Sequence, residues 1–156
     1  MINLFNLKNN FMRTIKLLLF AFIISSIISC SKSSTTSTPN PNVTFAATLS
    51  GTNETPPNAS AGSGSATLTY NTSTKIFSVT VTYSGTTAAA GHIHKGAIGV
   101  AGAVIFPFSS LTSPITYTSA ALDATQEADL MANLYYVNLH STAFPGGEIR
   151  GQLIKQ

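Results

Sequence analysis

The sequence predicts an all-β domain, a Greek-key-like β-sandwich or flattened barrel of about eight strands with one short helical insertion. The main evidence is the alternation of apolar and polar residues from Phe77 to Tyr83. Two earlier segments have the same pattern. A strand with one face in a core and the other in water has this period of two. These segments are also rich in threonine, valine and aromatic residues, which favour strands.

Eight strands are expected in chain order. Three long ones come first, and the turn from Asn71 to Thr74 joins the second to the third as a hairpin. Five shorter segments follow, and the turn from Pro145 to Gly147 joins the last two as another hairpin. The predicted strands are 44–50, 65–70, 77–83, 91–94, 103–108, 115–119, 135–140 and 148–154.

One helix is expected between the sixth and seventh strands. Asp123 and Gln126 have the spacing of a capping box, in which each side chain hydrogen-bonds the backbone N–H of the other residue. The residues from Glu127 to Leu134 follow without glycine or proline. The sequence therefore predicts a short helix that begins after Asp123 and runs to Leu134.

The N-terminal segment has the pattern of an export signal. Basic residues are followed by an apolar run over 17–28 and then by Ser29 and Cys30, the only cysteine of the chain. The site resembles the lipobox of bacterial lipoproteins. That resemblance implies cleavage after a signal peptide over 1–29 and a diacylglycerol on Cys30. Met12 also opens a compact signal head, so the sequence leaves both Met1 and Met12 as the start of translation.

A tether and an envelope location follow from this interpretation. Residues 30–42 are rich in serine, threonine and proline and contain no large apolar side chain, so we expect the lipidated Cys30 and a flexible tether there. Ser31 is not an inner-membrane retention residue of the aspartate type, which favours the outer membrane. The expected partners are the membrane, through the lipid, and an envelope or extracellular protein or glycan.

The charge of the exported chain excludes nucleic acid as a partner. The whole chain has eight lysines and arginines against five acidic residues, a formal net charge of +3. Three of those basic residues, Lys8, Arg13 and Lys16, belong to the predicted signal peptide. The remaining charges balance and form no basic cluster of the kind that binds phosphate backbones.

Four motifs occur in order along the predicted domain: LSGTNETPP, HIHKG, YVNLH and PGGEIRGQL. In this order they resemble the CHRD domain, which is named after chordin and is common in exported bacterial proteins. The resemblance covers residues 43–153, so residues 43–156 are interpreted as a CHRD β-sandwich domain. In chordin these domains accompany cysteine-rich modules that bind growth factors, and this sequence contains no such module. The resemblance implies no activity.

Polar side chains of three predicted strands fall on one face of the sheet. His92 and His94 alternate with Ile93, and His140 alternates with Leu139, so the histidines point away from the core. We expect a solvent-exposed polar patch there, with Glu148 paired to an arginine or a histidine. Its residues are His92, His94, Asn138, His140, Glu148, Arg150 and Gln152.

One interpretation of the patch is a copper or zinc site formed by His92, His94 and His140. Imidazole suits both metals, and three histidines with an open position are a known site plan. The His-x-His pair with a distant histidine is also similar to part of the copper site of superoxide dismutase. The chain lacks that family's fourth histidine, zinc loop and disulfide. The charge of Lys95, beside the pair, opposes a bound cation.

The other interpretation is structural, with the polar groups bonding the strands to one another. Glu54 is then expected to be a surface carboxylate in a turn. No serine or carboxylate stands in a catalytic arrangement, so no catalytic residue is predicted. We therefore expect a lipid-anchored, non-catalytic binding or structural module of the cell envelope. The alternative is a metal-binding protein, redox-active if the metal is copper.

Overall fold

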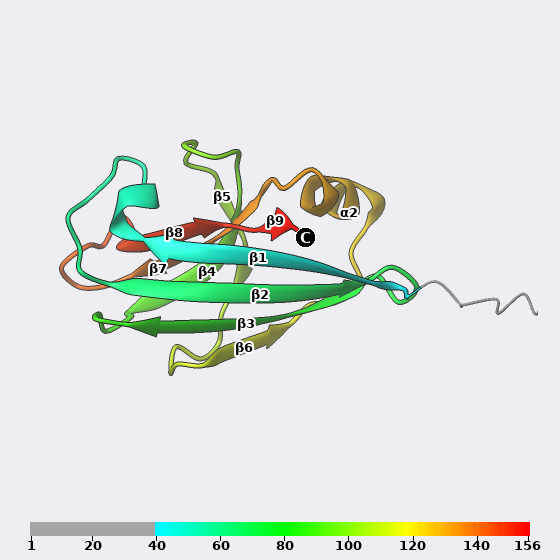
Figure 1. The fold of residues 1–156 in the computed structure, drawn as a ribbon, viewed down its shortest axis with the longest axis horizontal. Helices are drawn as coiled ribbons and strands as arrows, with labels where there is room; N and C mark the ends of the chain where they lie inside the picture. The colour runs from blue at the N-terminus through cyan, green and yellow to red at the C-terminus, as the bar shows by residue number, and fades with distance from the viewer. Residues whose placement is uncertain (1–39) are drawn as a thin grey trace, which may run out of the picture. The chain divides into compact units, whose positions relative to one another are not determined.

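The computed structural model describes residues 40–156, which form a single unit with one β-sheet (Figure 1). The predicted signal peptide, the predicted lipidation site Cys30 and residues 31–39 of the predicted tether lie outside the described residues. The unit has its own hydrophobic core, with side chains from Phe45 to Leu153, so it can fold as an isolated domain. Within it, no helix has the length and apolar character needed to cross a membrane.

The predicted all-β class with one short α-helix is confirmed. All eight predicted strands form, and the last is divided in two. A turn of 3-10 helix, η1 (Gly51–Asn53), follows the first strand, and the α-helix is α2 (Ala124–Met131). The strands are β1 (Asn42–Ser50), β2 (Ser63–Asn71), β3 (Ile76–Ser84), β4 (Ala90–Lys95), β5 (Ala103–Pro107), β6 (Ile115–Thr118), β7 (Tyr135–His140), β8 (Ile149–Gln152) and β9 (Ile154–Lys155).

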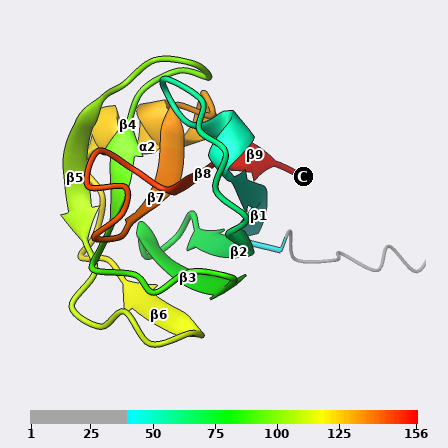
Figure 2. The same cartoon turned by 90° about the vertical axis from the view of Figure 1, so that its left-hand side faces the viewer.

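The strands form one antiparallel sheet in the order β5-β4-β7-β8-β1-β2-β3-β6, with β9 beside β1. The sheet curls so that the half with β4 and β7 faces the half with β2 and β3 (Figure 2). The result is a flattened half-barrel, open between β5 and β6. Both predicted hairpins, β2–β3 and β7–β8, are present.

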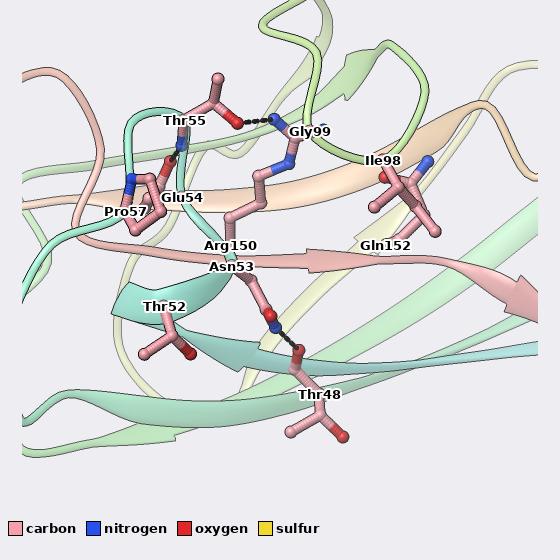
Figure 3. Close-up of a pocket in the computed structure, with 10 residues that line it drawn as sticks. All are labelled: Thr48, Thr52, Asn53, Glu54, Thr55, Pro57, Ile98, Gly99, Arg150 and Gln152. Atoms are coloured by element: carbon pink, nitrogen blue, oxygen red, sulfur yellow. Dashed lines mark hydrogen bonds between the residues drawn. The ribbon is translucent and has the colours of Figure 1, made fainter.

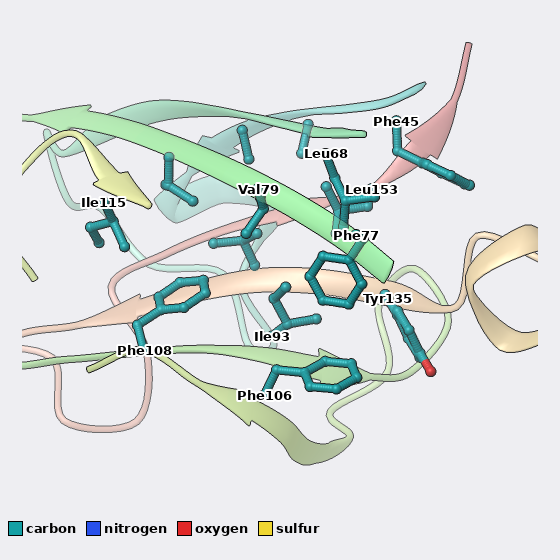
Figure 4. Close-up of a cluster of buried hydrophobic side chains, with 14 of the residues drawn as sticks. Phe45, Leu68, Phe77, Val79, Ile93, Phe106, Phe108, Ile115, Tyr135 and Leu153 are labelled. Carbon is teal, nitrogen blue, oxygen red and sulfur yellow. The ribbon is translucent and has the colours of Figure 1, made fainter. Parts of the chain in front are cut away.

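The core fills the inside of this curl. The register places Phe45, Leu68 and Val79 in one row across β1, β2 and β3, and all three are buried. From the other half, Phe106 meets Phe77 edge-on, with 5.1 Å between ring centroids (Figure 4). Each large side chain buried in this way stabilises the domain by about 1.5–3 kcal/mol. The core therefore holds the two halves together and fixes which face of β4 and β7 points outward.

The helix begins as predicted and ends earlier. Asp123 is its N-cap and forms the predicted capping box with Gln126 in both directions. The predicted end at Leu134 is wrong, because α2 ends at Met131. Asn133 has a φ of 58°, in the left-handed region that terminates helices, and asparagine tolerates that conformation.

Replacing Asp123 by alanine is expected to destabilise the domain by about 1 kcal/mol, because a backbone N–H of the first turn loses its acceptor. Asp123→Asn keeps a side-chain oxygen at the same place and should cost much less. Urea unfolding of both variants measures the difference. Equal losses in the two variants would show that the capping oxygen is not the stabilising group.

The predicted strand 148–154 is interrupted at Leu153. The backbone N–H of Leu153 still bonds to the Tyr135 carbonyl of β7, and its side chain is fully buried. β8 pairs with β7 and, at Arg150, with Ser50 of β1, and β9 pairs with β1 at Phe45 and Ala46. The pairing with β1 is therefore interrupted between β8 and β9, which a period-two pattern does not reveal.

Candidate metal centre

The three histidines lie together on the outer face of β4 and β7. His92 and His94 flank Ile93, whose side chain is fully buried in the core. In the register His92 lies opposite Asn138, so His140 is its diagonal neighbour on β7. The ring centroids of His92 and His140 are 5.2 Å apart. The prediction that the histidines of β4 and β7 point away from the core is confirmed. The three histidine rings of the chain lie next to one another.

One nitrogen of each ring is buried and has no hydrogen-bond partner. These atoms are His92 Nδ1, His94 Nε2 and His140 Nε2. One ligand nitrogen from each of the three rings lies within 4.8 Å of the others. A buried polar atom without a partner costs about 1–3 kcal/mol. A single ion bound between the three rings would give these nitrogens a partner.

Backbone carbonyls fix the orientation of two of the rings. His94 Nδ1 lies 2.9 Å from the Gly102 carbonyl oxygen, and His140 Nδ1 lies 2.9 Å from that of Pro145. A carbonyl oxygen only accepts, so in the neutral ring Nδ1 holds the proton and Nε2 presents a lone pair. Histidine ligands of metals usually donate their other N–H in this way. The unpartnered Nε2 atoms of both rings are therefore prepared as ligands.

Burial favours the uncharged form of two of these histidines. It lowers the pKa of His92, with smaller contributions from the neighbouring His140 and His94. Burial also lowers the pKa of His94, against the hydrogen bond to Gly102, which raises it. A neutral imidazole is the form that binds a metal ion. The electrostatics of the face thus keep the ligands available near neutral pH.

An aromatic stack supports His94 from the side. Its ring lies parallel to that of Tyr136, with 4.9 Å between centroids and 10° between planes. The guanidinium carbon of Arg150 lies 3.4 Å from the centroid of the same Tyr136 ring. The Tyr136 hydroxyl accepts a hydrogen bond from the Gly102 N–H. The position of His94 is therefore fixed by its ring face as well as by its Nδ1.

The prediction that this face is exposed to solvent is wrong for much of the patch. Asn138, Glu148 and Arg150 are all at least nine-tenths buried, and Gln152 is partly buried. The segment after η1 and the turn between β4 and β5 cover Arg150. It donates a hydrogen bond to the Thr55 hydroxyl of the first segment (Figure 3) and another to the Ala97 carbonyl of the second. Alternation identifies the outer face of a strand, but it does not show which loops fold over that face.

The expected pairing of Glu148 with an arginine or a histidine is also wrong. Glu148 accepts hydrogen bonds from the hydroxyl groups of Ser60 and Thr86 instead. Within residues 40–156 the salt bridges are those of Lys75 and of Lys95. Glu148 thus fastens the loops that precede β2 and follow β3 to the start of β8.

The cation beside the histidine pair is neutralised. Lys95 Nζ lies 2.7 Å from Asp129 Oδ2 on α2. The partly exposed pair contributes little stability by itself. It does hold the ammonium group against the helix, so the expected repulsion of a metal ion by Lys95 is weakened.

Glu54 is a second carboxylate whose predicted position, at the surface of a turn, is wrong. Its side chain is only 7% exposed, and its Oε1 is buried without a hydrogen-bond partner. That oxygen would lie 2.7 Å from a Cβ placed on Gly147, so the glycine makes room for it. Burial raises the Glu54 pKa, against the charges of Arg150 and His140. A turn segment has no periodic pattern, so only its place in a shared motif could have singled out Glu54.

The curl of the sheet, the covered outer face and the histidine triad define an all-β domain with a candidate metal-ligand set. The chain belongs to the CHRD family: the CHRD domain matches residues 45–153. No curated protein and no solved structure shows a significant match to the chain.

Proposed function

We propose that this CHRD domain binds one metal ion through His92, His94 and His140. Two observations carry the proposal: each ring brings one ligand nitrogen within 4.8 Å of the others, and each ring has one buried nitrogen without a hydrogen-bond partner. Two of the rings already donate their other nitrogen to backbone carbonyls, as ligating histidines do. Copper is the metal we favour, because imidazole suits it and because Cu²⁺ is bound most tightly among the common divalent ions.

The triad leaves room for a further ligand. Metal–nitrogen bonds are about 2.0–2.1 Å long, so ligands of a tetrahedral ion lie about 3.3 Å apart. The present spacing of up to 4.8 Å therefore needs only small side-chain movements to close on an ion. Three protein ligands also leave one coordination position open, the arrangement of reactive rather than purely structural sites.

The competing interpretation, that the histidines only fasten strands, explains less. The hydrogen bonds of His94 and His140 go to loop carbonyls, not to side chains of the neighbouring strand. These two bonds use the Nδ1 atoms of His94 and His140. They give no role to the unpartnered nitrogen that each of the three rings still has. A metal ion gives all three a partner, which is why we favour binding.

The test is a titration of the isolated domain, residues 40–156, with Cu²⁺ and Zn²⁺ after removal of metal by a chelator. We expect one ion per chain with sub-micromolar affinity. A variant with His92, His94 and His140 all replaced by alanine should bind no ion at that affinity. Glu127→Gln, which removes a surface carboxylate outside the triad, is the control and should bind like the unchanged domain. Equal binding by the triple variant would overturn the proposal.

Copper binding is expected to weaken as the pH falls, because protons compete for the same lone pairs. Burial lowers the pKa values of His92 and His94 below the ordinary value of 6.5, so both rings stay neutral to a lower pH. These two ligands should therefore lose less binding to protons near neutral pH than ordinary histidines would, and the affinity should fall most steeply below pH 6.5. Titrations at half-unit steps from pH 8 to pH 5 measure this. An affinity that stayed constant down to pH 5 would contradict histidine ligation.

We also propose that a lipid on Cys30 holds the domain at the outer membrane. The support is the sequence pattern of a basic head, an apolar run over 17–28 and a single cysteine. Two or more acyl chains give stable anchoring. In cells fed radioactive palmitate, the full chain should become labelled and sediment with outer membranes. Cys30→Ser should lose both properties, and labelling of that variant would contradict the proposal.

A further inference from the structure

A second site lies beside the triad, in a pocket to which none of the three histidines contributes. It is about 460 Å³ in volume and lies between the segment after η1 and the turn between β4 and β5. Thr48 of β1, with Arg150 and Gln152 of β8, forms its floor (Figure 3). This volume is within the range of small-molecule sites.

The cationic group of the pocket is Arg150, which is 2% exposed. Its guanidinium donates to the Thr55 hydroxyl and to the Ala97 carbonyl, and both of these acceptors are uncharged. No carboxylate of residues 40–156 lies within salt-bridge distance of it. A buried cation without an anion is costly, and a guanidinium pairs best with a carboxylate. Arg150 therefore lacks the partner that its chemistry prefers.

Glu54 lines the same pocket but does not supply that partner. Its Oε2 accepts from the Thr55 backbone N–H, and its Oε1 faces Gly147 on the other side. Burial raises its pKa, and the nearby charge of Arg150 acts in the opposite direction without the two groups forming an ion pair. An anion from outside would meet Arg150 without displacing any ion pair.

The other walls are neutral and suit a ligand with hydroxyl groups. Thr48, Thr52 and Asn53 bring two hydroxyls and an amide to the pocket, and the buried Oε1 of Gln152 has no hydrogen-bond partner. Ile98, 75% exposed, adds an apolar surface at the rim. Hydroxyl and amide groups beside an apolar surface match a sugar ring, which has polar edges and apolar C–H faces.

We propose that this pocket binds an acidic saccharide, with the carboxylate of a uronic acid residue against Arg150. The sugar hydroxyls then bind the threonine, asparagine and glutamine side chains of the pocket. This site needs no metal, and none of the triad histidines lines it.

The test is an NMR titration of the isotope-labelled domain, residues 40–156, in the presence of a chelator. The probe is D-galacturonate, and the control ligand is D-galactose, which has the same ring without the carboxylate. We expect saturable shifts at Thr52, Asn53 and Gly99 with galacturonate, and an affinity for galactose that is weaker by about tenfold. Equal responses to both sugars, no response, or shifts confined to the triad would each overturn the proposal.

Substitutions of the exposed residue Ile98 test whether the charge of the pocket contributes to ligand binding, and they do not disturb the core. Ile98→Glu places a negative charge at the rim and should weaken galacturonate binding by about fivefold relative to Ile98→Gln. Val104→Glu adds the same charge on β5, outside the pocket, and should bind like the unchanged domain. A similar loss in both glutamate variants would point to the overall charge and would overturn the site. Because metal is absent, neither result bears on the triad.

Discussion

Saturating copper is expected to raise the unfolding temperature of the domain by about 10 °C, and His140→Ala is expected to abolish most of that rise. A ligand of the native state adds about 2.7 kcal/mol of stability when its free concentration is a hundred times its dissociation constant. In a domain of this size each kcal/mol shifts the unfolding temperature by about 4 °C. His140 is the only ligand from β7, so its loss leaves two histidines of one strand.

Calorimetry of the apo and copper-loaded forms makes this measurement directly. Both variants, His140→Ala and the control Glu127→Gln, are compared with the unchanged domain at the same metal concentration. The control should keep the full rise. A rise of equal size in His140→Ala would show that copper stabilises the domain from another place.

Gly102→Ala is expected to destabilise the domain by about 3 kcal/mol and to weaken metal binding by about tenfold. A Cβ at Gly102 would lie 1.6 Å from the Lys95 carbonyl oxygen, so the backbone between β4 and β5 has to move. The same residue accepts from His94 and donates to Tyr136. The strain therefore reaches His94, a proposed metal ligand, through the carbonyl that orients its ring.

The matched control is Gly146→Ala, where an added Cβ has nothing within 4 Å. That variant should unfold within about 0.5 kcal/mol of the unchanged domain and bind metal normally. Urea unfolding and copper titration of both variants give the comparison. If Gly102→Ala behaved like Gly146→Ala, the close approach of the two backbones would not constrain the site.

Alternation was enough to predict the strands and the faces of the histidines. His92 and His94 flank a core residue, and the Pro145–Gly147 turn places the strand of His140 beside that of Arg150. These features depend on the period of a strand and on short connections, both of which are local in sequence.

The loop segments that bury the outer face of β8 could not be predicted in the same way. Arg150 is buried by Thr55 and Ala97, 95 and 53 residues away in the chain, and Lys95 is held by Asp129 of the helix. Irregular segments have no period, so nothing local indicates which face they cover. Glu54, in one such segment, was expected at the surface for the same reason.

The opening of the half-barrel has a consequence for how the protein behaves at high concentration. Among the strands of residues 40–156, β5 and β6 are the two ends of the sheet. Exposed strand ends can add strands from other molecules and start aggregation. Here both are short, Pro107 ends β5, and Pro114 comes just before β6. Proline has no N–H to offer to an incoming strand, so the sheet can stay open at this seam without polymerising.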